Sequence, residues 1–219
     1  MGARAQLPEA PVYVLTSGRT FSAAEEFTYN LKNLERATIV GETTGGGAHP
    51  VDRHVFADLQ ISMSLPFGRA VNPITGTNWE GTGIDPHIAV PVDQAFDVAY
   101  LDALKKLKEN ADEEQKSSLS WAITGLEVAA NPVNLTETEM TPFAGQYGPR
   151  RVWVENGEMW YQRGENPKFK MVAMGEGWFM FEDLDYFRIE FEQEDGQEAT
   201  GLVGHYSNGR QDRNSRSGA

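Results

Sequence analysis

The sequence contains no cysteine among its 219 residues. Disulfide bonds, thiolate catalysis and cysteine-ligated metal sites are therefore excluded. The sequence also lacks any uninterrupted run of about eighteen apolar residues, the length that a membrane-spanning helix needs. The first residues, MGARAQLPEAP, have no apolar stretch of the kind found in a signal peptide. We therefore expect no membrane span, and any export signal would have to lie outside this sequence.

Positive charge is scarce. The sequence has 19 lysine and arginine residues and 32 acidic residues, which give a net charge of −13. Such a surface repels phosphate backbones, so we expect no nucleic-acid partner. What is present is ordinary globular composition. The hydrophobic share of 40% and the aromatic share of 11% are sufficient to fill a core.

The first part of the chain has an α/β pattern. Residues 11–17 and 36–42 are continuous apolar runs, typical of strands that are buried on both faces of a parallel sheet. Between them, residues 22–34 place apolar side chains at helical spacing. Strand, helix and strand within about thirty residues predict a βαβ unit. Residues 58–65 alternate between apolar and polar and predict a half-exposed strand, whereas residues 72–86 are rich in turn formers.

Helical spacing returns at residues 93–110 and again at 119–130, with the charged connection ADEEQKSS before the second helix. After residue 136 the pattern becomes all-β, beginning with a hairpin at 150–163 whose turn is Asn156-Gly157. Short aromatic strands are predicted to follow at 168–173, 178–182, 187–192 and 201–206. These strands predict a meander of five or six strands that closes, or nearly closes, into a small barrel.

These patterns divide the chain into four parts. Residues 1–110 are predicted to be a partial α/β domain and 111–135 a helical linker. Residues 136–212 are predicted to form the β-meander or barrel module, and 213–219 a flexible polar tail.

Ser22 stands at the junction of the first strand and helix, and its role has two interpretations. Ser22-Ala23-Ala24-Glu25 has the sequence of a capping box, in which the hydroxyl only stabilises the start of the helix. Alternatively, a serine at this turn presents its hydroxyl at the carboxyl edge of the sheet, where free N–H groups stabilise an oxyanion. A nucleophile elbow works in this way, although the G-x-S-x-G pattern is absent. The residues alone leave both interpretations open.

Two blocks of sequence carry a family resemblance. YVLTSGRTFSAAEEFTYNLKNLERATIVGETTGGGAHPV, followed by NWEGTGIDPHIAV, resembles the tail-specific (C-terminal-processing) serine proteases. The more similar branch contains the tricorn core protease and the interphotoreceptor retinoid-binding protein modules. The resemblance implies a crotonase-like, ββα-type catalytic domain whose N-terminal half is absent from this sequence. The β module also resembles the small domain that follows the catalytic domain in many bacterial members.

The resemblance implies roles for several residues. Ser22 matches the nucleophile, and the N–H of Ala23 supplies one oxyanion donor, with Gly46 as the second candidate. Glu80 matches an acid that tunes the catalytic hydrogen-bond network in the tricorn-like branch. Gly47 occupies the position of the lysine base of the tail-specific branch, so a serine–lysine dyad is excluded on this alignment.

A serine hydroxyl needs a base to become a useful nucleophile. His49 is the best candidate, because it lies two residues after Gly47 at the edge where Ser22 projects, with Glu80 to orient it. Alternatively, His49 is a loop residue without a proton-transfer role, or another subunit donates the base. The other histidines are expected at the surface (His54), in a structural role (His87) and in the β module (His205).

Ligands other than a substrate are not expected. TTGGGA is neither a Walker loop nor G-x-G-x-x-G, and no two histidines are spaced i, i+4, so we expect no nucleotide, metal or other cofactor. Aromatic side chains of the β module either fill the barrel or line a ligand cavity. They are Trp153, Trp160, Tyr161, Trp178, Phe179, Phe181, Tyr186 and Phe187.

We therefore predict a serine hydrolase that cleaves peptide or small ester substrates through a Ser22 acyl-enzyme, with esterase activity retained longer than peptidase activity. The alternatives are a non-catalytic binding protein for an apolar ligand or peptide, and a fragment of a longer protein without a function of its own. An incomplete sheet exposes an edge and apolar faces, so we expect a homodimer or higher homo-oligomer. The resemblance suggests a bacterial periplasmic or secreted protein, whereas the residues themselves do not indicate a compartment.

Overall fold

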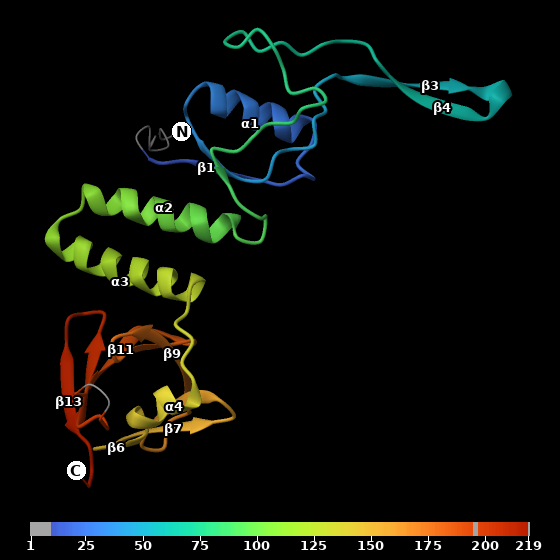
Figure 1. The fold of residues 1–219 in the computed structure, drawn as a ribbon. Helices are drawn as coiled ribbons and strands as arrows, with labels where there is room; N and C mark the ends of the chain where they lie inside the picture. Colours follow the sequence, from blue (N-terminus) through green and yellow to red (C-terminus); the bar gives the residue numbers. More distant parts are fainter. Residues whose placement is uncertain (1–9, 195–196, 219) are drawn as a thin grey trace, which may run out of the picture. The chain divides into compact units, whose positions relative to one another are not determined.

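The computed structural model describes residues 10–194 and 197–218. The chain divides into two compact units, a first unit, Met1–Ala103, and a second unit, Leu104–Ala219. Their elements are drawn in Figure 1. Within the described ranges, no helix combines the length and apolar character that crossing a bilayer requires. The boundary between the units falls inside a helix, and the domain limits derived from the sequence stay predictions.

The first unit contains the predicted βαβ arrangement. Strand β1 (Tyr13–Thr16) leads into helix α1 (Ala23–Asn33) and then into β2 (Thr38–Gly41), which pairs with β1 in parallel. A short third strand, β5 (Ile88–Ala89), pairs with β2 in parallel. Because all three strands are parallel, their carboxyl ends lie at one edge of the sheet. The segments that follow β1 and β2 therefore begin at the same edge.

Strands β3 (Val51–Phe56) and β4 (Ile61–Pro66) form a separate antiparallel hairpin, joined by a 3-10 turn, η1 (Ala57–Leu59). Figure 1 shows this hairpin extending away from α1. The predicted strand is present, but both of its faces are exposed, and its one strand partner in the described part of the chain is β3.

Helix α2 (Ala95–Glu109) is followed by α3 (Glu113–Ala130). Helix α3 begins six residues earlier than the sequence pattern indicated. Asp112 and Gln115 form a capping box, in which the Gln115 N–H donates to the Asp112 carboxylate at 2.8 Å. The charged connection therefore starts the helix.

The rest of the second unit is a nearly closed antiparallel sheet of eight strands in the order β13-β12-β11-β10-β9-β8-β7-β6. A short helix, α4 (Glu137–Met140), and a 3-10 turn, η2 (Thr141–Phe143), precede it. The strands are β6 (Gly145–Tyr147), β7 (Arg150–Glu155), β8 (Glu158–Arg163), β9 (Phe169–Gly175), β10 (Trp178–Phe181), β11 (Leu184–Glu192), β12 (Gly201–Tyr206) and β13 (Gln211–Ser215). A bridge between Tyr147 and Arg216 brings the two ends of the sheet together.

The barrel has more strands than the five or six predicted. Strand β6 was not predicted, and β13 lies partly in the segment predicted to be a flexible tail. This polar segment is ordered by backbone pairing with β12, from Gly201↔Ser215 to His205↔Gln211. The Ser217 N–H then donates to the Gln146 carbonyl at 2.7 Å, which ties the end of the chain to β6.

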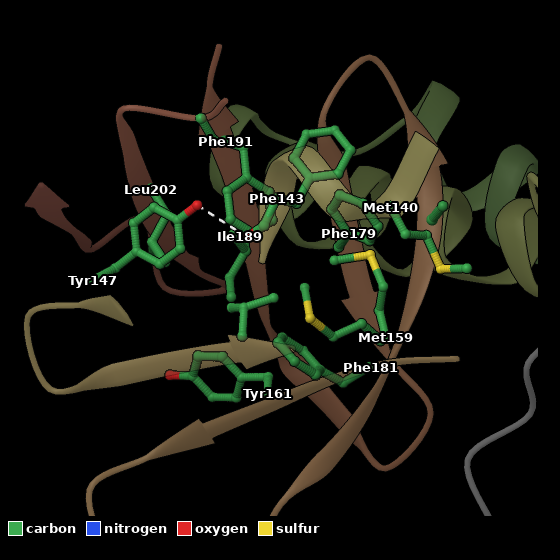
Figure 2. Close-up of a cluster of buried hydrophobic side chains, with 14 of the residues drawn as sticks. Met140, Phe143, Tyr147, Met159, Tyr161, Phe179, Phe181, Ile189, Phe191 and Leu202 are labelled. Carbon is green, nitrogen blue, oxygen red and sulfur yellow. Dashed lines mark hydrogen bonds between the residues drawn. The ribbon is translucent and has the colours of Figure 1, made fainter. Parts of the chain in front are cut away.

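Side chains fill the barrel, as Figure 2 shows. Tyr147, Ile189 and Leu202 are fully buried, and the Tyr147 hydroxyl donates to the Phe143 carbonyl at 2.9 Å. Four of the aromatic residues singled out in the sequence belong to this core, namely Tyr161, Phe179, Phe181 and Phe187. The other four are half-buried or exposed. Core packing is therefore the role of the buried aromatic residues.

Candidate active site

Ser22 occupies a sharp turn between β1 and α1. It is the residue immediately before the helix, with φ 56° and ψ −120°, and its side chain is exposed. A positive φ at a residue other than glycine is uncommon and strained. A sharp, strained strand-to-helix turn is also the geometry by which a nucleophile elbow exposes a serine hydroxyl. The local backbone therefore matches the second interpretation of this serine.

The capping box at this turn is unequal in its two halves. The Ser22 N–H donates to Glu25 Oε2 at 2.8 Å. The Glu25 N–H donates to the Ser22 carbonyl at 2.8 Å, and the Ser22 hydroxyl lies in the capping-box position toward the same N–H without making a side-chain capping hydrogen bond. The helix start is thus held by main-chain groups and by Glu25, which leaves the hydroxyl available for chemistry.

The N–H of Ala23 is the first amide of α1. Within the described ranges, no hydrogen bond engages this N–H. It lies next to the exposed Ser22 hydroxyl at the positive end of the helix dipole, where a developing negative charge is stabilised. Ala23 therefore has the free donor that an oxyanion hole requires.

Glu25 connects this turn to the glycine-rich loop that follows β2. Its side chain is fully buried, and its two oxygens accept four hydrogen bonds. The donors are the N–H groups of Ser22 (2.8 Å), Gly46 (2.7 Å) and Gly47 (2.9 Å) and the hydroxyl of Thr44 (2.5 Å). Burial by itself raises the pKa of Glu25, but the hydrogen bonds, from Thr44 first, outweigh it and lower this pKa below its usual value. An ionised carboxylate thus holds the loop against the turn.

The surroundings of Gly46 and Gly47 determine what each glycine of this loop can do. Gly46 was predicted to be the second oxyanion donor, but its N–H is already bound to Glu25. In this conformation it supplies no free donor. At Gly47, an added Cβ would lie 2.1 Å from Cζ of Phe21. The Phe21 ring therefore fills the space where a side chain at the lysine position would begin.

Glu80 and His49 lie together on the other side of the loop. Glu80 Oε2 accepts the N–H groups of Ala48 at 2.7 Å and of His49 at 2.9 Å. These two hydrogen bonds, His49 first, lower the pKa of Glu80. His49 Nδ1 is 3.8 Å from the same Glu80 oxygen. The structure thus brings the His49 imidazole near the Glu80 carboxylate, at a separation longer than a hydrogen bond.

The contact between nucleophile and base is not formed. His49 Nε2 is buried and has no hydrogen-bond partner, and within residues 10–194 and 197–218 no hydrogen bond joins the Ser22 hydroxyl to His49. With Nδ1 facing Glu80, Nε2 is the nitrogen that remains for proton transfer. Catalytic hydrogen bonds are often long or misaligned before substrate binds.

The other histidines have roles outside this site. The Nδ1 atom of His87 accepts a hydrogen bond from the Ile39 N–H of β2 at 2.9 Å, which is a structural role, as predicted. His54 is exposed on β3, and His205 is 2.9 Å from Glu190 in the barrel. In the described part of the chain, no three metal-ligating side chains gather.

A strained, exposed serine between a parallel strand and a helix, beside a free first-turn amide, defines a nucleophile-elbow type of α/β segment. The family model of peptidase family S41 matches residues 2–90. This segment of the chain is therefore similar to peptidase family S41, in agreement with the resemblance to the tail-specific proteases. A solved structure, the photosystem II D1 C-terminal processing protease, matches with 25% identity and a TM-score of 0.33. That match covers 38% of this chain and 21% of the protease, so the chain spans about a fifth of its length.

Proposed function

We propose that this chain supplies the nucleophile and one oxyanion donor of a serine hydrolase that cleaves peptide or ester bonds. The observation that carries the proposal is Ser22, which is exposed on a strained, elbow-like backbone and whose hydroxyl makes no capping hydrogen bond. The free N–H of Ala23 supports the same conclusion. The match of residues 2–90 to peptidase family S41 supports a polypeptide substrate.

The proposed reaction has two halves. Ser22 Oγ attacks the carbonyl carbon while its proton passes to the base, and the Ala23 N–H stabilises the resulting oxyanion. The bond to the leaving group then breaks, and the base returns the proton to the departing amine or alcohol. A water molecule repeats the sequence on the acyl-enzyme, which releases the acid and restores the Ser22 hydroxyl.

His49 is the proposed base, with Glu80 as its orienting acid. The lowered pKa of Glu80 keeps that carboxylate ionised beside Nδ1, which favours a proton on Nδ1 and leaves Nε2 as the acceptor. Proton transfer requires Nε2 to come within about 2.6–3.2 Å of the Ser22 hydroxyl. Since this contact is unformed, we expect esters to be cleaved faster than peptides, because their leaving groups need less protonation.

The test is labelling with a fluorophosphonate probe, together with hydrolysis of p-nitrophenyl butyrate. Ser22→Ala should abolish labelling and lower the hydrolysis rate by about a hundredfold or more. Ser117→Ala, at an exposed position in α3, is the matched control and should behave as the wild type. Equal rates for Ser22→Ala and the wild type would remove Ser22 from the mechanism.

A second proposed function is binding of an apolar ligand or peptide without catalysis. It is favoured by the unformed contact between Ser22 and His49 and by Phe21, which occupies the space of a lysine base at position 47. Native mass spectrometry of the purified protein should then detect a bound fatty acid, retinoid or peptide, and the fluorophosphonate probe should not react.

We also propose that the protein is a homo-oligomer, at least a dimer. Hairpin β3–β4 supports this, because Phe56, Ile61, Met63 and Leu65 share one exposed face. Two-stranded hairpins are marginally stable in water without a partner. Strand β4 between Ile61 and Leu65 carries no charge that would prevent edge-to-edge pairing with a second copy.

A further inference from the structure

The barrel sheet opens between β8 and β9. These strands pair only at Trp160↔Lys170 and Tyr161↔Phe169. The next pair in this register, Met159 and Met171, is not formed. On its other side β9 remains paired with β10 through residue 173. Residues 171–173 therefore keep one partner strand and turn their other edge toward a gap in the sheet.

A cavity of about 260 Å³ lies at this gap. The apolar part of its lining contains Met140, Met159, Met171 and Phe179, all of them buried. Three of the seven methionines of the chain thus line one cavity. Methionine is flexible and polarisable, and it is overused at surfaces that bind varied apolar partners.

The open edge of β9 already accepts a hydrogen bond from the segment between α3 and α4. Residues 133–135 line the cavity, and the Val133 N–H donates to the Ala173 carbonyl at 3.4 Å. This hydrogen bond is long, and one such bond does not make residues 133–135 a strand paired with β9. It indicates that main-chain groups of β9 face the gap.

The mouth of the cavity is charged. Lys170 Nζ lies 2.9 Å from Glu158 Oε1 and 2.9 Å from Glu182 Oε1, so one ammonium group links β8 to the residue after β10. All three side chains line the cavity. Two carboxylates against one ammonium leave a net negative mouth above an apolar wall.

We propose that this cavity binds an extended, apolar stretch of polypeptide with a basic residue beside it. The peptide enters between β8 and β9, replaces the Val133 N–H at the Ala173 carbonyl and pairs through its main chain with residues 171–173, the mode known as β-augmentation. Its apolar side chain packs against the methionines, and its basic residue replaces part of the Lys170 interaction with the two glutamates. A volume of about 260 Å³ is below that of sites for drug-sized ligands, which start near 300 Å³, and suits one large side chain. The site does not depend on the chemistry of Ser22.

The probe is the fluorescein-labelled peptide acetyl-Lys-Val-Leu-Val-Lys-amide, with binding followed by fluorescence anisotropy to the full chain at about 0.15 M salt. Three altered peptides test the three features of the proposal. N-methylation of the leucine removes a main-chain donor, leucine to serine removes the apolar side chain, and lysine to glutamate reverses the charge. Each should weaken binding about tenfold.

Variants of the protein locate the site. Glu158→Lys should weaken binding of the lysine peptide about tenfold and strengthen binding of the glutamate peptide. Glu155→Lys is the matched control, because Glu155 is a paired surface carboxylate on the neighbouring strand outside the cavity. Ala173→Leu, which adds a side chain inside the cavity, should also weaken binding, with near-ultraviolet circular dichroism to verify folding. Equal affinities for all the peptides, or equal effects of the two lysine variants, would overturn the proposal.

Discussion

The two units of this protein bury apolar side chains to different extents. The second unit gathers fifteen buried hydrophobic residues into one cluster inside a nearly closed sheet. The first unit has two clusters of three buried hydrophobic residues each. Of the twenty exposed large hydrophobic side chains in the described ranges, seventeen belong to the first unit. The unit that carries the candidate active site therefore buries much less apolar surface on its own.

The units also differ in what they bury besides apolar groups. The first unit relies on a polar centre, in which Glu25, Thr28 and Thr44 are buried and hydrogen-bonded. The second unit buries two arginines, Arg150, whose guanidinium is bound to Asp212, and Arg188, which donates to the Trp121 carbonyl, around a cluster that is apolar and aromatic. Hydrogen bonds in a buried polar centre restrict the orientation of side chains more than apolar contacts do, because each donor needs its acceptor. The first unit thus gains a defined site at the expense of apolar packing.

The largest effect is expected from Glu25→Ala. This change leaves four donors without their acceptor in a buried place and should destabilise the first unit by about 3–5 kcal/mol. Urea unfolding followed by hydrogen exchange should show lower protection of α1 and β2, with the barrel strands unchanged. Glu26→Ala, at the adjacent exposed position of α1, is the matched control.

The same carboxylate gives a dependence on pH. The pKa of Glu25 is lower in the folded protein than its usual value of 4.5, so its contribution to stability is present above that value. It is lost as the pH falls below about 4.5 and through the lower folded pKa. The wild type should lose protection of the first unit in this window, and Glu25→Ala should lose less. A wild type and variant with parallel acid profiles would contradict the role assigned to Glu25.

A smaller effect is expected from breaking the predicted dimer. Met63→Glu places a charge on the apolar face of hairpin β3–β4 and should weaken self-association about tenfold or more. Ser62→Glu places the same charge on the opposite face of β4 and should leave the dimer intact. Size-exclusion chromatography with light scattering measures both. A monomeric wild type would show that something other than a second copy covers the hairpin.

Local patterns in the sequence were sufficient for much of the fold. The βαβ unit follows from apolar runs and helical spacing, and the Asn156-Gly157 hairpin follows from the positive φ that both residues adopt (54° and 75°). The turn at Ser22 was also predictable, because a strand, a serine and a capping box stand in order. These features depend on neighbours within a few positions.

The remaining features depend on contacts that the sequence does not encode locally. Glu25 was interpreted only as part of a capping box, although it also binds the Thr44 hydroxyl and two amides about twenty positions away. The same contacts remove Gly46 from the list of oxyanion donors. Phe27 and Leu34 have helical spacing, yet both are exposed, because spacing defines a face of α1 without saying whether anything covers it.

The smallest effect is expected inside the barrel, from Tyr147→Phe. Tyr147 is fully buried and its hydroxyl donates to the Phe143 carbonyl, so the change should cost about 1 kcal/mol at pH 7. Burial raises the pKa of Tyr147 from 10.0 to about 12. A raised folded pKa gives stability that is complete below pH 10 and is lost as the pH rises toward 12. The advantage of tyrosine over phenylalanine should therefore shrink in that window, whereas Tyr186→Phe, at an exposed position, should change nothing. A constant difference between wild type and Tyr147→Phe from pH 7 to pH 12, measured by urea unfolding, would show that this apolar core does not discriminate against a charged phenolate.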